Sequence, residues 1–246
     1  MHRFFAPTLD PGDDIVELPR EEAEHLSRVL RIGVGDSVAV FNGHGVEFLA
    51  RVVSSERRDV RVQLVSRIET APEPSVSTTI VQCVLKGDKM DDVVRDAVMM
   101  GVTAVQPIVS RRSETTVASL IRGARVERWR RIALASVKQS RRAVLPDILM
   151  PMTFESWLGE PSTDVRLMFV EPGIGGAEPM ARVRDEPTPL SASVIVGPEG
   201  GWDPAEYQSA AVRGVRLMSL GARTLRADAV PVAALSVLQF LWDASC

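Results

Sequence analysis

The sequence predicts an α/β protein in which a small β domain precedes a parallel sheet covered by helices. Short β-prone segments separated by turn residues fill residues 1–70, a spacing typical of a compact barrel. From about Val76 onward, β-prone runs and helical segments alternate along the chain. The proline-containing segment 70–75 has the composition of a linker, so we place the domain boundary between residues 72 and 73.

The first part of the chain is organised around one strong hairpin signal. Asn42-Gly43-His44-Gly45 separates two apolar runs, as a tight turn between antiparallel strands does. A short helix precedes the hairpin, and Leu26, Val29 and Leu30 are spaced to share its buried face. The expected elements are a helix over 21–30, strands over 37–41, 46–53 and 60–65, and a second turn over 54–59.

The second part is expected to contain strands over 78–85, 102–109, 165–170, 192–196 and 215–220, and helices over 89–100, 122–142, 203–213 and 230–242. Asp88 is placed to cap the first of these helices and Gly101 to end it. Asp203 followed by Pro204 and Glu206 is a strong helix start. In the helix over 122–142, the side chains available for packing are those of Ile132, Leu134, Ala135 and Val137.

The composition is that of an ordinary globular protein and argues against membrane-spanning, secreted and metal-binding proteins. The 246 residues are 45% hydrophobic and 25% charged, and no apolar run approaches the ~20 residues of a membrane span. The N-terminus lacks the apolar core of a secretory signal. Cys83 and Cys246 lie far apart and the three histidines show no ligand spacing, so we expect a cytoplasmic protein without disulfides or metal.

Positive charge is concentrated in one part of an otherwise acidic chain. The net charge is -3, yet residues 111–142 contain ten Lys and Arg against only Glu114 and Glu127. A solvated helix face would show such a run. A surface for a polyanion such as RNA would show it as well, and the acidic character of the rest favours that interpretation.

Three expected strands end in unusual loops, and ligands of parallel α/β sheets bind beyond the carboxyl ends of strands. The loops are Phe169-Val170-Glu171-Pro172-Gly173, Gly197-Pro198-Glu199-Gly200-Gly201-Trp202 and Leu220-Gly221-Ala222-Arg223-Thr224-Leu225-Arg226. Three glycines within five residues allow the backbone to approach a ligand closely. A tight strand-to-helix turn would also explain the second loop taken alone.

Other ligand-binding motifs are incomplete. No lysine follows these glycines as a phosphate-binding P-loop requires. Gly173-Ile174-Gly175-Gly176 starts like a dinucleotide fingerprint, but Glu178 stands where its third glycine belongs. The α/β part contains no histidine, which removes the usual base of Ser or Cys hydrolases.

The second and third loops together resemble the RsmE family of SPOUT-class methyltransferases. GPEGG at 197–201 and LGARTLR at 220–226 carry the resemblance, and weaker matches extend over nearly the whole chain in the same order. These matches are Arg3-Phe4-Phe5, His25-Leu26, Val29-Leu30-Arg31, Gly35-Asp36, Lys86-Gly87-Asp88-Lys89-Met90-Asp91, Arg112-Ser113 and Gln139-Ser140 with Arg142.

The resemblance implies an S-adenosylmethionine-dependent enzyme that methylates N3 of a uridine in small-subunit (16S) ribosomal RNA. It implies a PUA-like β-barrel over 1–72, which binds RNA, and a SPOUT α/β methyltransferase domain over 73–246 with a C-terminal trefoil knot. It also implies a homodimer. The apolar segment 230–242 would supply dimer surface, although burial in its own core explains that segment equally well.

The resemblance also assigns the candidate site residues. The cofactor would be held by Val170, Glu171, Gly197, Glu199, Gly200, Gly201, Leu220, Gly221 and Leu225. The catalytic candidates are Arg226, to stabilise charge on a uracil oxygen, and Asp228, to position a base or accept the proton. The RNA-binding candidates are Arg3, Arg111, Arg112, Arg141, Arg142 and Arg223, although Arg3 also suits burial of its neighbouring rings and Arg223 a structural ion pair.

The sequence departs from the family pattern at two places. Ala227-Asp228-Ala229-Val230 replaces the usual Thr-Glu-Thr-Ala, so both hydroxyls are lost and the carboxylate is shortened. Lys138 stands where an acidic residue is expected before Gln139. Other functions therefore stay open: a non-catalytic RNA-binding protein, a methyltransferase acting on another RNA nucleoside and, more distantly, a nucleotide-dependent oxidoreductase.

Overall fold

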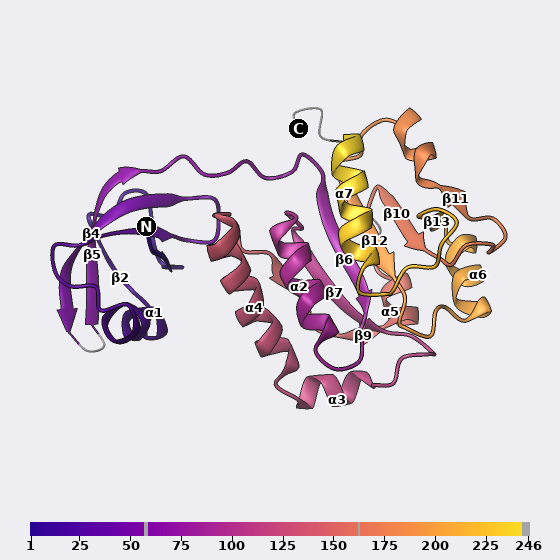
Figure 1. Cartoon of the computed structure of the whole chain (residues 1–246), viewed down its shortest axis with the longest axis horizontal. Helices are drawn as coiled ribbons and strands as arrows, with labels where there is room; N and C mark the ends of the chain where they lie inside the picture. Colours follow the sequence, from indigo (N-terminus) through magenta and orange to yellow (C-terminus); the bar gives the residue numbers. More distant parts are fainter. Residues whose placement is uncertain (57–58, 162, 243–246) are drawn as a thin grey trace. The chain divides into compact units, whose positions relative to one another are not determined.

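The computed structural model describes residues 1–56, 59–161 and 163–242 and divides into two compact units (Figure 1). The first unit contains residues 1–73 and 137–145, and the second contains residues 74–136 and 146–246. The return of 137–145 to the first unit was not expected from the sequence. Cys246 and part of the turn expected over 54–59 lie outside the described residues.

The first unit is built on a five-stranded sheet with the strand order β1-β3-β4-β5-β2. Its elements are β1 (Arg3–Phe5), β2 (Ile15–Glu17), α1 (Arg20–Glu24), a π-helical turn (His25–Val29), β3 (Ser37–Phe41), β4 (Glu47–Glu56) and β5 (Asp59–Arg67). β3 and β4 form the antiparallel hairpin that the Asn-Gly signal predicts, with Gly43 at φ +82° in its turn. Parallel β1 and antiparallel β2 complete the two edges.

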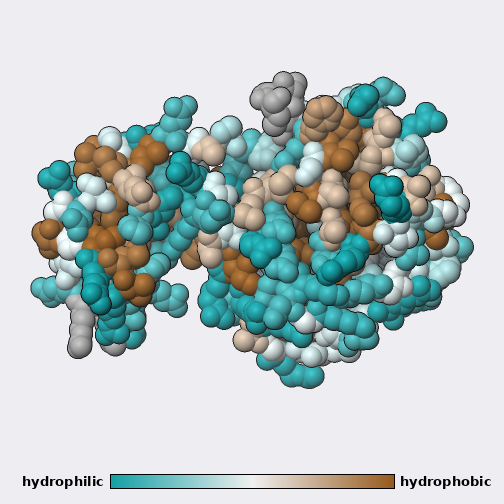
Figure 2. All heavy atoms as spheres, viewed as in Figure 1, coloured by the Kyte–Doolittle hydropathy of each residue, from teal (hydrophilic) through white to brown (hydrophobic). Residues whose placement is uncertain are grey.

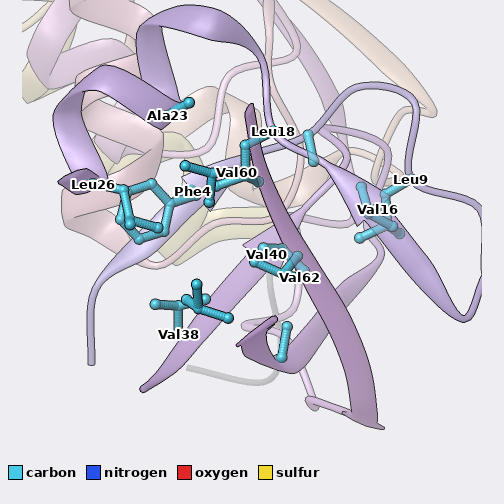
Figure 3. Packing of buried hydrophobic residues seen from close by; sticks show 13 residues of the cluster. Phe4, Leu9, Val16, Leu18, Ala23, Leu26, Val38, Val40, Val60 and Val62 are labelled. Atoms are coloured by element: carbon cyan, nitrogen blue, oxygen red, sulfur yellow. The ribbon is translucent and has the colours of Figure 1, made fainter. Parts of the chain in front are cut away.

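Alternating side chains of these strands enclose one apolar core (Figure 3). Phe4, Val40 and Val62 lie at its centre, and Leu26 reaches it from the helical segment. The expectation that Val29 shares this face is wrong, because its side chain is 69% exposed. The Leu30 N–H bonds to the His25 carbonyl, so the last helical turn is widened and Val29 rotates away from the core.

The second unit is a parallel sheet with the order β11-β13-β10-β12-β6-β7-β8, and β9 also pairs with β7. Its elements are β6 (Ser77–Cys83), α2 (Lys89–Met99), β7 (Ala104–Val109), α3 (Val117–Arg122), α4 (Arg125–Ser140), β8 (Asp147–Ile148), β9 (Met152–Thr153), α5 (Phe154–Leu158), β10 (Val165–Phe169), β11 (Glu178–Pro179), a 3-10 helix (Met180–Asp185), β12 (Ser191–Val196), α6 (Pro204–Val212), β13 (Arg216–Ser219) and α7 (Val230–Trp242).

Helices cover both faces of this sheet, as buried parallel strands require. On one face, side chains of β6, β7, β10 and β12 pack with Phe154 and Trp157 of α5 and Ala210 of α6. α2 and α7 pack together, and α7 also contacts β12. The predicted mixed α/β class is confirmed. None of the described helices has the length and hydropathy of a membrane span.

Local capping signals predict the helix ends unevenly. Gly101, at φ +89°, ends α2 as predicted, and the Val102 N–H reaches back to the Ala97 carbonyl. Asp203 and Glu206 form the predicted capping box of α6. Asp88 makes no side-chain cap, because its carboxylate accepts a hydrogen bond from Arg128 at 3.1 Å instead.

The single helix expected over 122–142 is two helices. Extended backbone at Gly123 separates α3 from α4, so the longer helix begins at Arg125. Of the side chains expected to pack, Val137 is buried, Ile132 and Leu134 are half-buried, and Ala135 is exposed. The buried side chains of α4 are those of Val126, Trp129, Ala133, Ser136 and Val137.

Candidate active site

The strand order of the second unit brings the three predicted loops to one edge of the sheet. β13, β10 and β12 are neighbours, and Phe169 pairs with both Val196 and Met218 in parallel register. The loops that follow these strands therefore begin side by side at the carboxyl end of the sheet. All three border one pocket.

The pocket confirms that the loops lie together and shows which predicted residues face the cavity. Of the residues proposed to bind cofactor, the lining includes Val170, Glu171, Gly197, Glu199, Gly201, Leu220 and Leu225. It also includes Arg223, Arg226 and Asp228. Gly200 and Gly221 are not among the lining residues. A Cβ atom on Gly200 would lie 3.4 Å from Cβ of Arg112.

The glycines of the second loop are required mainly by neighbouring side chains of the protein itself. A Cβ atom on Gly197 would lie 2.9 Å from the indole nitrogen of Trp202, and one on Gly201 would lie 2.7 Å from a carboxylate oxygen of Glu171. Trp202 in turn donates its indole N–H to the Phe169 carbonyl at 3.0 Å. Close packing between the first and second loops thus explains two glycines that the sequence suggested for ligand approach.

The third loop depends on one glycine for its backbone conformation. Gly221 has φ +104°, and a Cβ there would meet nothing within 4 Å. A substitution at this position is opposed by the backbone angle alone.

Arg226 and Asp228 form a two-point ion pair at the end of the third loop. Nε and Nη2 of Arg226 donate to the two carboxylate oxygens of Asp228 at 3.0 and 2.6 Å. The arginine side chain is 73% exposed, whereas that of Asp228 is 19% exposed. The two catalytic candidates are therefore coupled, with Asp228 orienting the guanidinium at the pocket.

Glu199 faces the same pocket but is engaged by residues near the start of α2. Its Oε1 accepts hydrogen bonds from Lys89 Nζ at 2.9 Å and from the Lys86 backbone N–H at 3.1 Å. Burial acts to raise the pKa of Glu199, but the bonds from Lys89 and the backbone outweigh it and hold this pKa below its usual value. Glu199 is thus an ionised partner of Lys89.

Lys89 belongs to a motif of the sequence from which no role for it was predicted. The structure places it in the pocket lining because β6, whose following loop leads into α2, is hydrogen-bonded to β12. Its position just beyond a strand end was the available signal. The other lining residues that the sequence did not single out are Phe169, Pro172, Val196, Pro198, Trp202, Thr224, Ala227 and Val230.

Four of the arginines predicted to contact RNA have exposed side chains. Arg223 borders the pocket, and Arg141 lies after the end of α4 with φ +63°. Arg111 contacts the Asp203 carboxylate at 3.3 Å, and Arg112 donates to the Gly200 carbonyl at 2.9 Å. The last two side chains therefore also brace the second loop and the start of α6.

Arg3 has structural contacts in place of the expected exposure to RNA. Its side chain is 10% exposed, pairs with Glu47 at 2.8 Å, and lies over the Phe41 ring. The remaining guanidinium hydrogens bond to the carbonyls of residues 137, 138 and 142, so all five donors have partners within the first unit. The expectation that Arg3 is available to RNA does not fit this geometry.

Arg142 is likewise buried, and it forms an ion pair with Glu73. Lys138, at the position where the family pattern has an acidic residue, pairs with Glu22. Together with Arg3 these side chains attach residues 137–145 to the sheet of the first unit. The charge at Lys138 thus has a local partner of opposite sign.

No ligand set for a metal is found in the part of the chain that the structure describes, where no three His, Cys, Asp or Glu side chains come together. Cys83 is buried, and burial raises the pKa of its thiol far above the usual value. A buried neutral thiol is a poor nucleophile, so this cysteine is a packing residue.

The chain is similar to RNA methyltransferases of known sequence and structure. A family model described as an RNA methyltransferase domain matches residues 72–239, and one described as an RNA methyltransferase PUA domain matches residues 18–65. The crystal structure of ribosomal RNA small subunit methyltransferase E from Neisseria gonorrhoeae, bound to S-adenosyl methionine, superposes with a TM-score of 0.87. It is 31% identical, with 98% of each chain covered. The chain belongs to this methyltransferase family.

Other members of the family match over most of their length. Ribosomal RNA small subunit methyltransferase E of Aquifex aeolicus is 26% identical over 97% of this chain and 99% of its own. The Synechocystis protein of the same name is 28% identical over 93% of this chain and 74% of its own. The family expected from the sequence is confirmed, as are its PUA and methyltransferase domains.

Proposed function

We propose that this protein transfers a methyl group from S-adenosylmethionine to N3 of a uridine in small-subunit (16S) ribosomal RNA. One observation carries the proposal. Loops after three adjoining parallel strands close around a single pocket, in a chain that matches a methyltransferase crystallised with S-adenosyl methionine over 98% of its length. In the proposed reaction the cofactor supplies an electrophilic methyl group.

The chemistry of the pocket fits this cofactor. Apolar side chains, among them Phe169, Val196 and Leu220, suit an adenine ring. The carboxylate of Glu171 lies at the same cavity and suits ribose hydroxyls or a cationic group. We assign cofactor contacts to Val170, Glu171, Gly197, Gly201, Leu220 and Leu225, with Gly200 and Gly221 shaping the loops.

Methylation at N3 makes two demands on the protein. The uridine must be unpaired or turned out of its stack, because N3 lies on the pairing edge. Its imide proton must also leave, which puts negative charge on the flanking carbonyl oxygens. Asp228 engages Nε and Nη2 of Arg226, so Nη1 is the atom that we assign to a uracil oxygen.

The RNA chain itself is proposed to lie along exposed arginines. Arg111, Arg112, Arg141 and Arg223 carry the exposed charge that phosphates require, which gives salt-dependent affinity rather than sequence choice. We assign RNA binding also to the PUA-like domain over 1–72, as a barrel, and catalysis to the domain over 73–246. Since the proposed substrate is ribosomal, the proposal places the protein in the cytoplasm.

Two further proposals concern the C-terminal part of the chain. We propose that the loops around β13 are threaded as a trefoil knot; β13 lies between β10 and β11, and its following loop returns to the pocket, which supports this. We also propose a homodimer through α7. Apolar side chains gather over this helix (Figure 2), and Phe240 is 73% exposed.

Nucleoside mass spectrometry tests the activity. Small ribosomal subunits from cells that lack the protein are incubated with it and S-adenosylmethionine, and large subunits serve as the control. We expect N3-methyluridine to appear in the small-subunit RNA only. A methyl group on another nucleoside would assign a different reaction to the same fold, and RNA binding without transfer would favour a non-catalytic protein.

A further inference from the structure

Lys89 lines the pocket together with Arg223 and Arg226, and it is the one of these three cations with no assigned role. It is the first residue of α2, its side chain is 37% exposed, and its Nζ lies 2.9 Å from Glu199 Oε1. The lining of the pocket includes both Lys89 and Arg226. Each of these cations is held by one carboxylate, Glu199 in the first case and Asp228 in the second.

The proposed reaction requires charge stabilisation at two atoms. When N3 of uracil loses its proton, the negative charge spreads onto the carbonyl oxygens on both sides of N3. A single guanidinium at one of these oxygens leaves the other without a partner. A buried or partly buried oxyanion without a donor is costly, and donors held in place before the reaction lower the barrier.

We propose that Lys89 Nζ contacts one carbonyl oxygen of the target uracil and stabilises the uracil anion, with Arg226 serving the other oxygen. This inference rests on the proposed function. In the step, the N3 proton leaves to a base or to water, and the N3 electron pair forms the new bond to the methyl carbon. The carbon–sulfur bond breaks with its electron pair remaining on sulfur, which becomes a neutral thioether.

Glu199 is then a positioning residue rather than a cofactor contact. The Lys86 backbone N–H fixes its carboxylate from the loop after β6, and Gly87 gives that loop a left-handed turn at φ +59°. The lysine is attached to the second loop through this carboxylate and faces the pocket. Its ammonium has three donors, so one bond to Glu199 leaves others for a substrate oxygen.

Lys89→Met tests the inference by single-turnover methyl transfer to small subunits across a pH range. We expect the rate near neutral pH to fall by roughly 100-fold, the loss typical of removing one donor to a developing oxyanion. The rate should recover as pH rises, because solvent then removes the imide proton without help. S-Adenosylmethionine affinity should stay within a factor of two, and Lys89→Arg should restore part of the rate.

Arg95→Met is the matched control, since Arg95 is an exposed cation on α2 that pairs with Asp92 and Asp96. It should leave the rate and its pH profile unchanged. If Lys89→Met lowers cofactor affinity or stability while the pH profile stays that of the wild type, Lys89 only secures the loops and the inference is overturned. Absence of transfer by the wild-type protein defeats the proposed function itself, and the inference with it.

Discussion

The role of a charged side chain in this protein depends on how many of its polar atoms already have partners within the protein. Arg226 and Arg3 illustrate the difference. Asp228 engages one edge of Arg226, and the side chain stays largely exposed at the pocket. Arg3 has partners for all five donors and is nearly buried. Arg226 is therefore free to contact a reacting ligand through its remaining donors, whereas Arg3 stabilises the first unit.

Replacement of Arg226 by Ala should strongly lower the rate of methyl transfer and spare cofactor binding. The guanidinium stands at the end of the third loop and is assigned to the uracil, so its loss should lower the transfer rate by roughly 100-fold or more. Calorimetric titration with S-adenosylmethionine should give the wild-type affinity. Unchanged turnover on small subunits would remove Arg226 from the mechanism.

Replacement of Arg3 by Ala should act on stability. The variant leaves the Glu47 carboxylate buried without its partner, and we expect a loss of roughly 3 kcal/mol in the free energy of unfolding. Urea denaturation measures it. Arg61→Ala, which breaks the exposed pair with Asp59, should cost less than about 1 kcal/mol. Weaker RNA binding at wild-type stability would instead make Arg3 an RNA contact.

Among the helices and strands, the sequence predicts those bounds that residues close together in the chain determine. α7 has the expected bounds, and α6 begins at the predicted capping box, because a cap is formed by residues close in the chain. Val29 was misplaced because the widening of its helical turn is not visible in the spacing of apolar residues.

The roles of Arg3 and Lys89 depended on contacts distant in sequence. Arg3 binds carbonyls more than 130 positions away, and Lys89 reaches the pocket only because β6 pairs with β12. The sequence could place the three loops at one edge of the sheet, since all parallel strands present their carboxyl ends there. Only the strand order makes the three loops neighbours and shows that Lys89 joins them.

The capping box of α6 should contribute measurably to the stability of the protein. Asp203→Ala should lower the free energy of unfolding by about 1 kcal/mol, the usual cost of losing a helix N-cap, as measured by urea denaturation. Asp203→Ala also removes the contact of this carboxylate with Arg111 at 3.3 Å. Arg111→Ala removes that contact alone and therefore measures its share of the lost stability. If the two variants lose the same stability, the cap contributes nothing of its own.

In the proposed homodimer, α7 would connect the interface between the two chains with the pocket. The helix begins at Val230, which lines the pocket, and Phe240 near its other end is 73% exposed. The exposed phenylalanine ring supports the proposed interface between copies of the chain.

Phe240→Glu should convert the proposed dimer to a monomer, because it puts a charge into an apolar interface. Sedimentation velocity measures the mass of each species. Val212→Glu is the matched control, since Val212 is likewise an exposed apolar residue, on α6. A Phe240→Glu protein that sediments like the wild type would place the interface elsewhere or show that the wild type is already monomeric.

Calorimetric titration with S-adenosylmethionine tests whether three loops at adjoining strand ends form the cofactor site. The wild-type protein should bind one equivalent of S-adenosylmethionine per chain. Gly221→Val should bind none measurably, because valine is excluded from φ +104° and the third loop must change its path. Wild-type affinity in that variant, or no binding by the wild-type protein, would show that these loops do not form the S-adenosylmethionine site.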